Sequence, residues 1–76
     1  WLKKFQKFGF NERQLKALVH LKHNPVGMSN SEYRELNNMN SVGDDRKAKR
    51  ELVKMSELDV LGKLGARRNR KYILLM

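Results

Sequence analysis

Residues 44–75 carry the change of periodicity that decides the fold, and their sequence is DDRKAKRELVKMSELDVLGKLGARRNRKYILL. Three apolar residues of the first half share one helix face, because they are spaced by four and by three: Ala48, Leu52 and Met55. The helical spacing then stops, and short apolar segments at residues 60–64 and 71–75 flank a loop with glycine and asparagine at residues 65–70. This stretch predicts a helix that follows a cap at Asp44 or Asp45 and runs to about Leu58, and then a β-hairpin.

Two more helix starts precede this stretch, and both have the pattern of a capping box. The paired residues are Asn11 with Gln14 and Ser29 with Glu32. The first pair begins a helix expected over residues 12–22, which ends before Pro25 because the residue preceding a proline avoids the helical conformation. The second begins a short helix over residues 30–36. Asp44 or Asp45 is expected to supply the side-chain cap of the third helix.

The order of these elements predicts the fold class. Residues 26–28 form an extended link that is expected to add a minor third strand to the hairpin. The predicted order is helix, short strand, helix, helix, strand, basic loop and strand. This is the order of a winged helix-turn-helix, an α+β fold with three helices and a C-terminal wing of two or three strands. We expect this domain to span residues 10–76.

Residues 1–9, WLKKFQKFG, are expected to form either a linker or a short N-terminal helix. Four of their apolar residues lie at helical spacing: Trp1, Leu2, Phe5 and Phe8. The preferred interpretation is that this stripe packs against the domain's own core, and the alternative is a dimer or interdomain contact. Because the chain opens at Trp1, we expect it to be a fragment of a larger protein.

Length and composition exclude several classes of protein. A chain of 76 residues forms one domain, and the absence of cysteine excludes a disulfide framework and a thiolate zinc site. No apolar run approaches the roughly 20 residues that a membrane-spanning helix needs, and no secretory signal is present. The expected location is the cytoplasm, with no membrane partner.

The net charge of +9 is unevenly placed along the chain. Residues 1–45 hold 7 basic and 5 acidic residues, whereas residues 46–71 hold 10 basic and 3 acidic residues. A strongly basic domain points to a polyanionic partner, and nucleic acid is the first candidate. The C-terminal half is therefore the expected binding side.

Several blocks of the sequence resemble one group of bacterial winged-helix domains. The matching blocks are FNERQLKAL (10–18) with LNERQ..AL, MSNSEYREL (28–36) with ITN.EYREL, AKREL (48–52) with A.RDL, Val60-Leu61 with GIL, and Arg70-Lys71-Tyr72 with G..Y. The group is the C-terminal domain of RecG-related, Alba-type DNA-binding transcriptional regulators, and similar domains end some Fic-family proteins. The resemblance implies a DNA-binding domain of a larger regulator. The chain departs from the pattern at Lys47, Glu51 and Asp59, where the group has Thr, Asp and Gly.

The first candidate binding element is the helix over residues 44–58. Its basic residues are Arg46, Lys47, Lys49, Arg50 and Lys54. A recognition helix presents the side chains of its first turns to base edges in the major groove, where arginine can hydrogen-bond both acceptors of guanine. The alternative is a solvated face with ion pairs four residues apart, such as Lys47 with Glu51.

The second candidate is the hairpin loop with its flanking strands. Its basic residues are Lys63, Arg67, Arg68, Arg70 and Lys71, and no acidic residue follows Val60. Such a loop can follow phosphates or enter a narrow minor groove. The alternative is a merely solvated hairpin tip.

Other chemistry is not expected of this chain. His20 and His23 are spaced like a metal pair but have no cysteine or suitably placed acid beside them, so we interpret them as surface residues. No nucleophile elbow, phosphate-binding glycine loop or zinc-protease motif is present, so no catalytic residue, cofactor or small-molecule substrate is expected. The competing function is a winged-helix module that contacts proteins, including other domains of its parent, without binding DNA itself.

Overall fold

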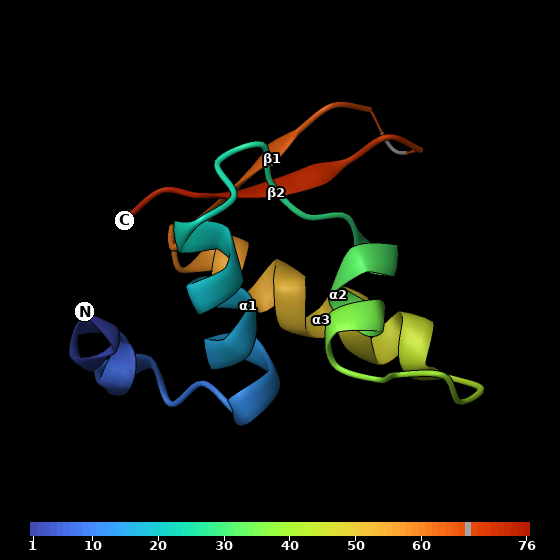
Figure 1. Cartoon of the computed structure of the whole chain (residues 1–76), viewed down its shortest axis with the longest axis horizontal. Coiled ribbons are helices and arrows are strands. Elements are labelled where there is room, and N and C mark those ends of the chain that lie inside the picture. Colours follow the sequence, from blue (N-terminus) through green and yellow to red (C-terminus); the bar gives the residue numbers. More distant parts are fainter. Residues whose placement is uncertain (67) are drawn as a thin grey trace.

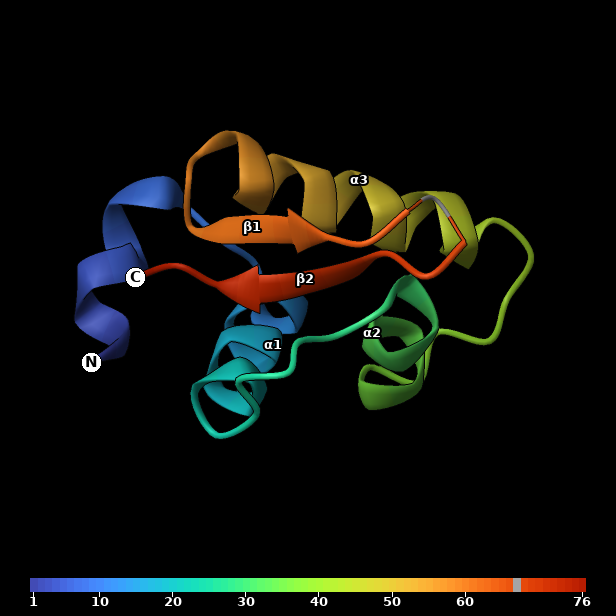
Figure 2. The same ribbon diagram turned by 90° about the horizontal axis from the view of Figure 1, so that it is seen from above.

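The computed structural model describes residues 1–66 and 68–76 and shows a small α+β domain (Figure 1). Its elements are η1 (Leu2–Phe8, a 3-10 helix), α1 (Glu12–Lys22), α2 (Asn30–Leu36), α3 (Asp44–Glu57), β1 (Leu61–Leu64) and β2 (Lys71–Leu74). The first two α-helices have the bounds expected from the sequence, and α3 ends one residue earlier than expected. In both Figure 1 and Figure 2 the hairpin tip lies at the α2 side of the molecule, whereas η1 and the C-terminus lie at the opposite end.

Both predicted capping boxes are confirmed. The Asn11 side chain accepts a hydrogen bond from the Gln14 backbone N–H at 2.9 Å, and the Gln14 side chain accepts from the Asn11 N–H at 3.0 Å. Ser29 and Glu32 make the same reciprocal pair at 3.1 and 3.0 Å. A side-chain cap contributes about 1 kcal/mol to helix stability, so these local contacts fix where α1 and α2 begin.

The sheet is a two-stranded antiparallel hairpin in which Leu61 pairs with Leu74 and Leu64 with Lys71. The third strand expected over residues 26–28 is reduced to one bridge, between Met28 and Tyr72, with N···O distances of 2.9 and 2.8 Å. The backbone N–H groups of the residues on either side of Met28 donate hydrogen bonds to other segments. That of Gly27 closes a turn to the Asn24 carbonyl, and that of Ser29 belongs to the α2 capping box. Only Met28 is left to pair with the hairpin.

One core joins residues from all of these elements. Its buried apolar residues include Phe5, Leu18, Leu21, Tyr33, Leu52, Met55, Leu61 and Tyr72. α3 packs against α2 and β1, and α1 packs against β2. Phe5 of η1 is fully buried, whereas Trp1 and Leu2 of the same stripe remain 40% and 38% exposed. No helix of the described residues has the length and apolar character needed to cross a membrane.

Candidate nucleic-acid interface

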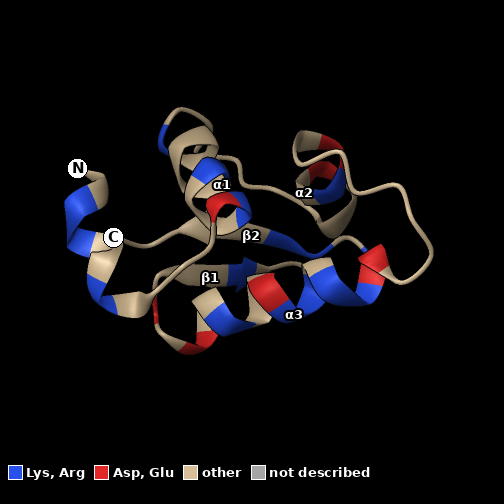
Figure 3. Cartoon of the chain, turned by 90° about the horizontal axis from the view of Figure 1, so that it is seen from below, with Lys and Arg blue, Asp and Glu red and all other residues tan. Residues whose placement is uncertain are grey.

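The hydrophobic core fixes which face of α3 points inward, and the candidate cations lie on the face that points outward. Ala48, Leu52 and Met55 are buried, as their spacing predicts, so the side chains on the opposite side of the helix point outward. All five cations singled out on this helix are exposed: Arg46, Lys47, Lys49, Arg50 and Lys54. Figure 3 shows basic segments along the length of α3, interrupted by acidic segments.

The start of α3 differs from the prediction. The N-cap is Gly43, with φ of 91°, and no side chain caps the helix, so the expected cap by Asp44 or Asp45 is wrong. The glycine conformation starts the helix at Asp44, and the Asp44 carboxylate reaches back to accept the Ser41 N–H at 2.9 Å. Both aspartates therefore lie in the first helical turn, where the helix dipole stabilises negative charge.

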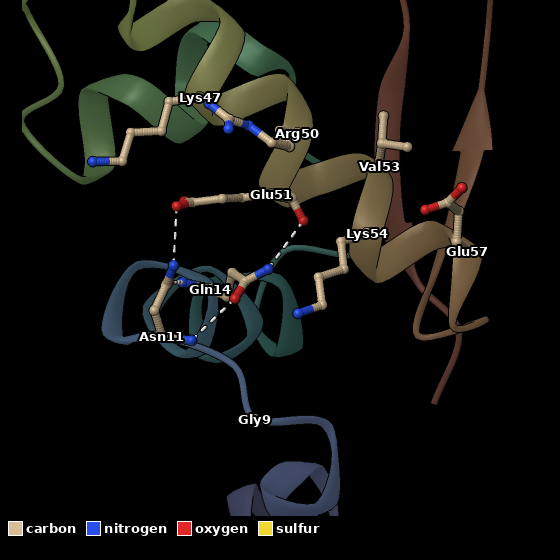
Figure 4. A pocket seen from close by; sticks show the side chains of 9 residues that line it. All are labelled: Gly9, Asn11, Gln14, Lys47, Arg50, Glu51, Val53, Lys54 and Glu57. Atoms are coloured by element: carbon tan, nitrogen blue, oxygen red, sulfur yellow. Dashed lines mark hydrogen bonds between the residues drawn. The ribbon is translucent and has the colours of Figure 1, made fainter.

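Glu51 lies within the basic face but turns its carboxylate toward α1 and α2. Its side chain is only 11% exposed. The carboxylate accepts hydrogen bonds from three side chains: Asn11 at 2.9 Å, Arg13 at 3.0 Å and Tyr33 at 2.6 Å. The Gln14 side chain also donates to the Glu51 backbone carbonyl at 3.1 Å, and Figure 4 shows the contacts made by Asn11 and Gln14.

This network replaces the surface ion pair between Lys47 and Glu51 that the sequence allows. The carboxylate pairs with Arg13 instead, because the planar guanidinium reaches both of its oxygens. Burial alone would raise the pKa of Glu51, but the hydrogen bonds from Arg13, Tyr33 and Asn11 outweigh it and lower the pKa below its usual value. Glu51 therefore stays ionised, and its charge is neutralised inside the domain.

Sequence reasoning missed this network, although two signals point to it. Glu51 is three residues after Ala48 and four before Met55, so it lies beside the buried stripe of α3 rather than opposite it. Tyr33 is fully buried, and a buried tyrosine hydroxyl needs a hydrogen-bond partner. Burial and the hydrogen bond to Glu51 raise the pKa of Tyr33 far above its usual value, so its hydroxyl remains a donor.

A groove of about 560 Å³ lies between the start of α1 and the basic face of α3 (Figure 4). Gly9 and Asn11 line one side, and Lys47, Arg50 and Lys54 line the other. Figure 4 shows the Glu51 side chain extending from α3 toward Asn11, below Lys47 and Arg50 in this view. The groove therefore has basic side chains on the α3 side, and of the two acids that line it, Glu51 is paired with Arg13 and Glu57 is exposed.

The hairpin carries the second set of cations. Lys63 and Arg68 are exposed, and Arg70 and Lys71 are half-buried; Arg67 lies outside the described residues. The Lys71 ammonium lies 3.1 Å from the carboxylate of Glu32, which ties β2 to the first turn of α2. This contact and the hydrogen bond from the Ser29 N–H lower the pKa of Glu32.

Most of the candidate cations have no acidic partner. Apart from Lys71, none of the α3 and hairpin cations that the structure describes has a side-chain nitrogen within 4.0 Å of a carboxylate oxygen of residues 1–66 or 68–76. Acidic groups are instead paired with Arg13, Arg34 and Lys71. Among the described residues, the cations without a carboxylate partner include those of α3 and the hairpin other than Lys71, and also the lysines of η1 and α1.

His20 lies in the last turn of α1 and is half-buried, and His23 is the C-cap of that helix and is exposed. Across residues 1–66 and 68–76 no group of three or more His, Cys, Asp or Glu side chains is arranged to hold a metal ion.

Comparisons of the chain with models of protein families, with curated proteins and with solved structures gave no match. The function proposed below therefore rests on the residues and geometry of this chain and on the sequence resemblance described above.

Proposed function

We propose that residues 10–76 are a winged helix-turn-helix domain that binds double-stranded DNA as part of a larger bacterial regulator. The order α1, bridge segment, α2, α3, β1, loop, β2 is compatible with this fold. The bridge between Met28 and Tyr72 supports the assignment further, because it places the link after α1 beside β2, on the side away from β1. The blocks that resemble RecG-related regulators are consistent with the same assignment.

The observation that carries the proposal is that the central acid of α3 is paired inside the domain while the cations of the same helix are exposed. Glu51 lies in the middle of the basic helix and would weaken binding to DNA if its charge were exposed. Its pairing with Arg13 and its burial remove that penalty. Among the described residues, the cations of α3 and Lys63 and Arg68 of the hairpin are exposed and have no carboxylate within 4.0 Å, as an electrostatic DNA-binding surface requires.

In this proposal α3 enters the major groove and the hairpin lies on the adjacent backbone or in the minor groove. Arg46 and Arg50 are the candidates for guanine contacts, since arginine can donate to O6 and N7 together. Lys47, Lys49 and Lys54 are candidates for phosphate contacts, which add affinity without sequence preference.

The test is a fluorescence-anisotropy titration of labelled duplexes between 50 and 200 mM salt. If five to eight phosphates are contacted, log K should fall with log salt at a slope of roughly −4 to −7. The double variant Arg46→Ala/Arg50→Ala should weaken binding and reduce discrimination between duplexes. The matched control Lys3→Ala/Lys4→Ala removes the same charge from η1, at the opposite end from the hairpin tip, and should bind nearly as the parent does.

The competing function is a module that binds an acidic protein. Backbone chemical-shift changes on duplex addition distinguish the two functions. DNA binding predicts saturating changes confined to residues 46–50 and to the hairpin. The absence of binding to any duplex at low salt would refute the proposed function for this domain.

A further inference from the structure

A second cavity, of about 500 Å³, lies where the start of α2, the first turns of α3 and the hairpin meet. Ser29 and Ser31 line it from α2, Lys49 from α3, and Arg68 and Arg70 from the end of the hairpin loop. Figure 2 shows the corresponding ends of the two helices and the hairpin tip at the same end of the molecule. Hydroxyl and cationic groups from three separate segments therefore converge on one cavity.

The charge of this cavity is positive even after its own acid is counted. Asp45 also lines it, but the Asp45 carboxylate lies 3.9 Å from the guanidinium of Arg34, another lining residue. Arg34 is held in place by its hydrogen bond to the Asn30 side-chain oxygen at 2.8 Å. One lining acid is thus matched by one lining arginine, and the charges of Lys49, Arg68 and Arg70 remain in excess.

The Arg70 side chain, which lines the cavity, has a hydrogen-bond donor without an acceptor in the described part of the chain. Its Nε has less than 1 Å² of exposed surface and no hydrogen-bond partner among the described residues. Leaving a buried donor unsatisfied destabilises a protein by about 1–3 kcal/mol, and by more when the group is charged. Such a donor is therefore expected to meet an acceptor from a ligand, in this case an anion.

We propose that this cavity holds one phosphate group of the DNA backbone, bound by Arg70 together with Arg68 and Lys49. A phosphate offers several charged oxygens at once, so it can accept from a guanidinium, an ammonium and the serine hydroxyls together. The proposal rests on the proposed function and adds a defined contact to it. Because the cavity joins α3 to the hairpin, the bound phosphate fixes how the helix and the wing sit on the duplex relative to each other.

The first test compares Arg70→Gln with Lys63→Gln. Both variants remove one hairpin cation, but Lys63 does not line the cavity. Arg70→Gln should weaken binding to unrelated duplexes by the same factor, roughly ten-fold, and reduce the salt slope by about 0.9. Lys63→Gln should have a clearly smaller effect. Circular dichroism of both variants establishes that each is folded, and equal losses of affinity in the two folded variants would overturn the proposal.

The second test follows the Arg70 Nε–Hε signal by NMR and so separates the cavity from the DNA-binding function. Addition of a duplex, or of inorganic phosphate alone, should shift this signal to saturation in the parent protein. If duplexes bind while the signal stays in place, the cavity proposal is wrong and the proposed function stands. If inorganic phosphate shifts the signal but no duplex binds, the cavity binds phosphate but not that of DNA. Both the cavity proposal and the proposed function are then wrong.

Discussion

Replacing Glu51 with glutamine keeps the shape of the side chain but removes its charge and one of its two acceptor oxygens, so this change tests the network as a whole. Tyr33 donates to Oε1 and Asn11 to Oε2 of the carboxylate, so in the amide only one of them keeps an acceptor oxygen and the other faces an NH2 group. Hydrogen bonds to charged groups contribute about 1.5–3 kcal/mol and neutral ones about 0.5–1.5 kcal/mol, so the donor that keeps an acceptor loses about 1 kcal/mol and the other loses at least as much.

The contribution of Arg13 is smaller. Its side chain is 34% exposed, so solvent screens the ion pair, and relief from burying the Glu51 charge offsets part of the loss. The expected decrease in the free energy of unfolding at pH 7 is therefore about 2 kcal/mol. For a domain of this size that decrease corresponds to a fall in Tm of roughly 8–16 °C. Urea unfolding followed by far-ultraviolet circular dichroism measures the difference directly.

The pH dependence of that difference tests the mechanism. The pKa of Glu51 is lowered in the folded state, so its stabilisation is complete above the ordinary glutamate pKa of 4.5 and is lost as pH falls through the folded-state value. The parent and Glu51→Gln should therefore converge in stability in acid. Glu57→Gln is the matched control, since Glu57 is an exposed acid of the same helix, and it should change stability by less than about 0.5 kcal/mol. A Glu51→Gln protein as stable as the parent at pH 7, or equally destabilised at every pH, would refute the reasoning.

Three further outcomes are expected from urea unfolding. Gly27→Ala should destabilise the domain by about 1–3 kcal/mol, because Gly27 has φ of 99° and an added Cβ would lie 2.8 Å from the Tyr72 carbonyl oxygen. An unchanged urea midpoint of unfolding would contradict this prediction. Leu52→Ala should cost about 2–5 kcal/mol, since Leu52 is fully buried in the core, and a loss below 1 kcal/mol would exclude that packing role. Lys71→Ala should cost less than about 1 kcal/mol because its pair with Glu32 is exposed, and a larger loss would show that the pair is structural.

The parts of the fold that depend on neighbouring residues were predictable from the sequence. Asn11 and Ser29 mark the starts of two helices through contacts made within three residues, and the spacing of Leu52 and Met55 identifies the buried face of α3. The cap of α3 was predicted wrongly because Asp44 is a common capping residue, whereas the structure uses the positive φ of Gly43.

The sequence by itself determined the helices, the hairpin and the concentration of cations in residues 46–71, because capping, periodicity and charge act over a few neighbouring positions. Only the tertiary structure decided which charges stay available. It brings Asn11 and Glu51, 40 residues apart, into contact. It also joins Ser29 of α2, Lys49 of α3 and Arg70 of the hairpin around one cavity. These arrangements depend on how distant segments pack around a shared core, and no local pattern encodes that packing.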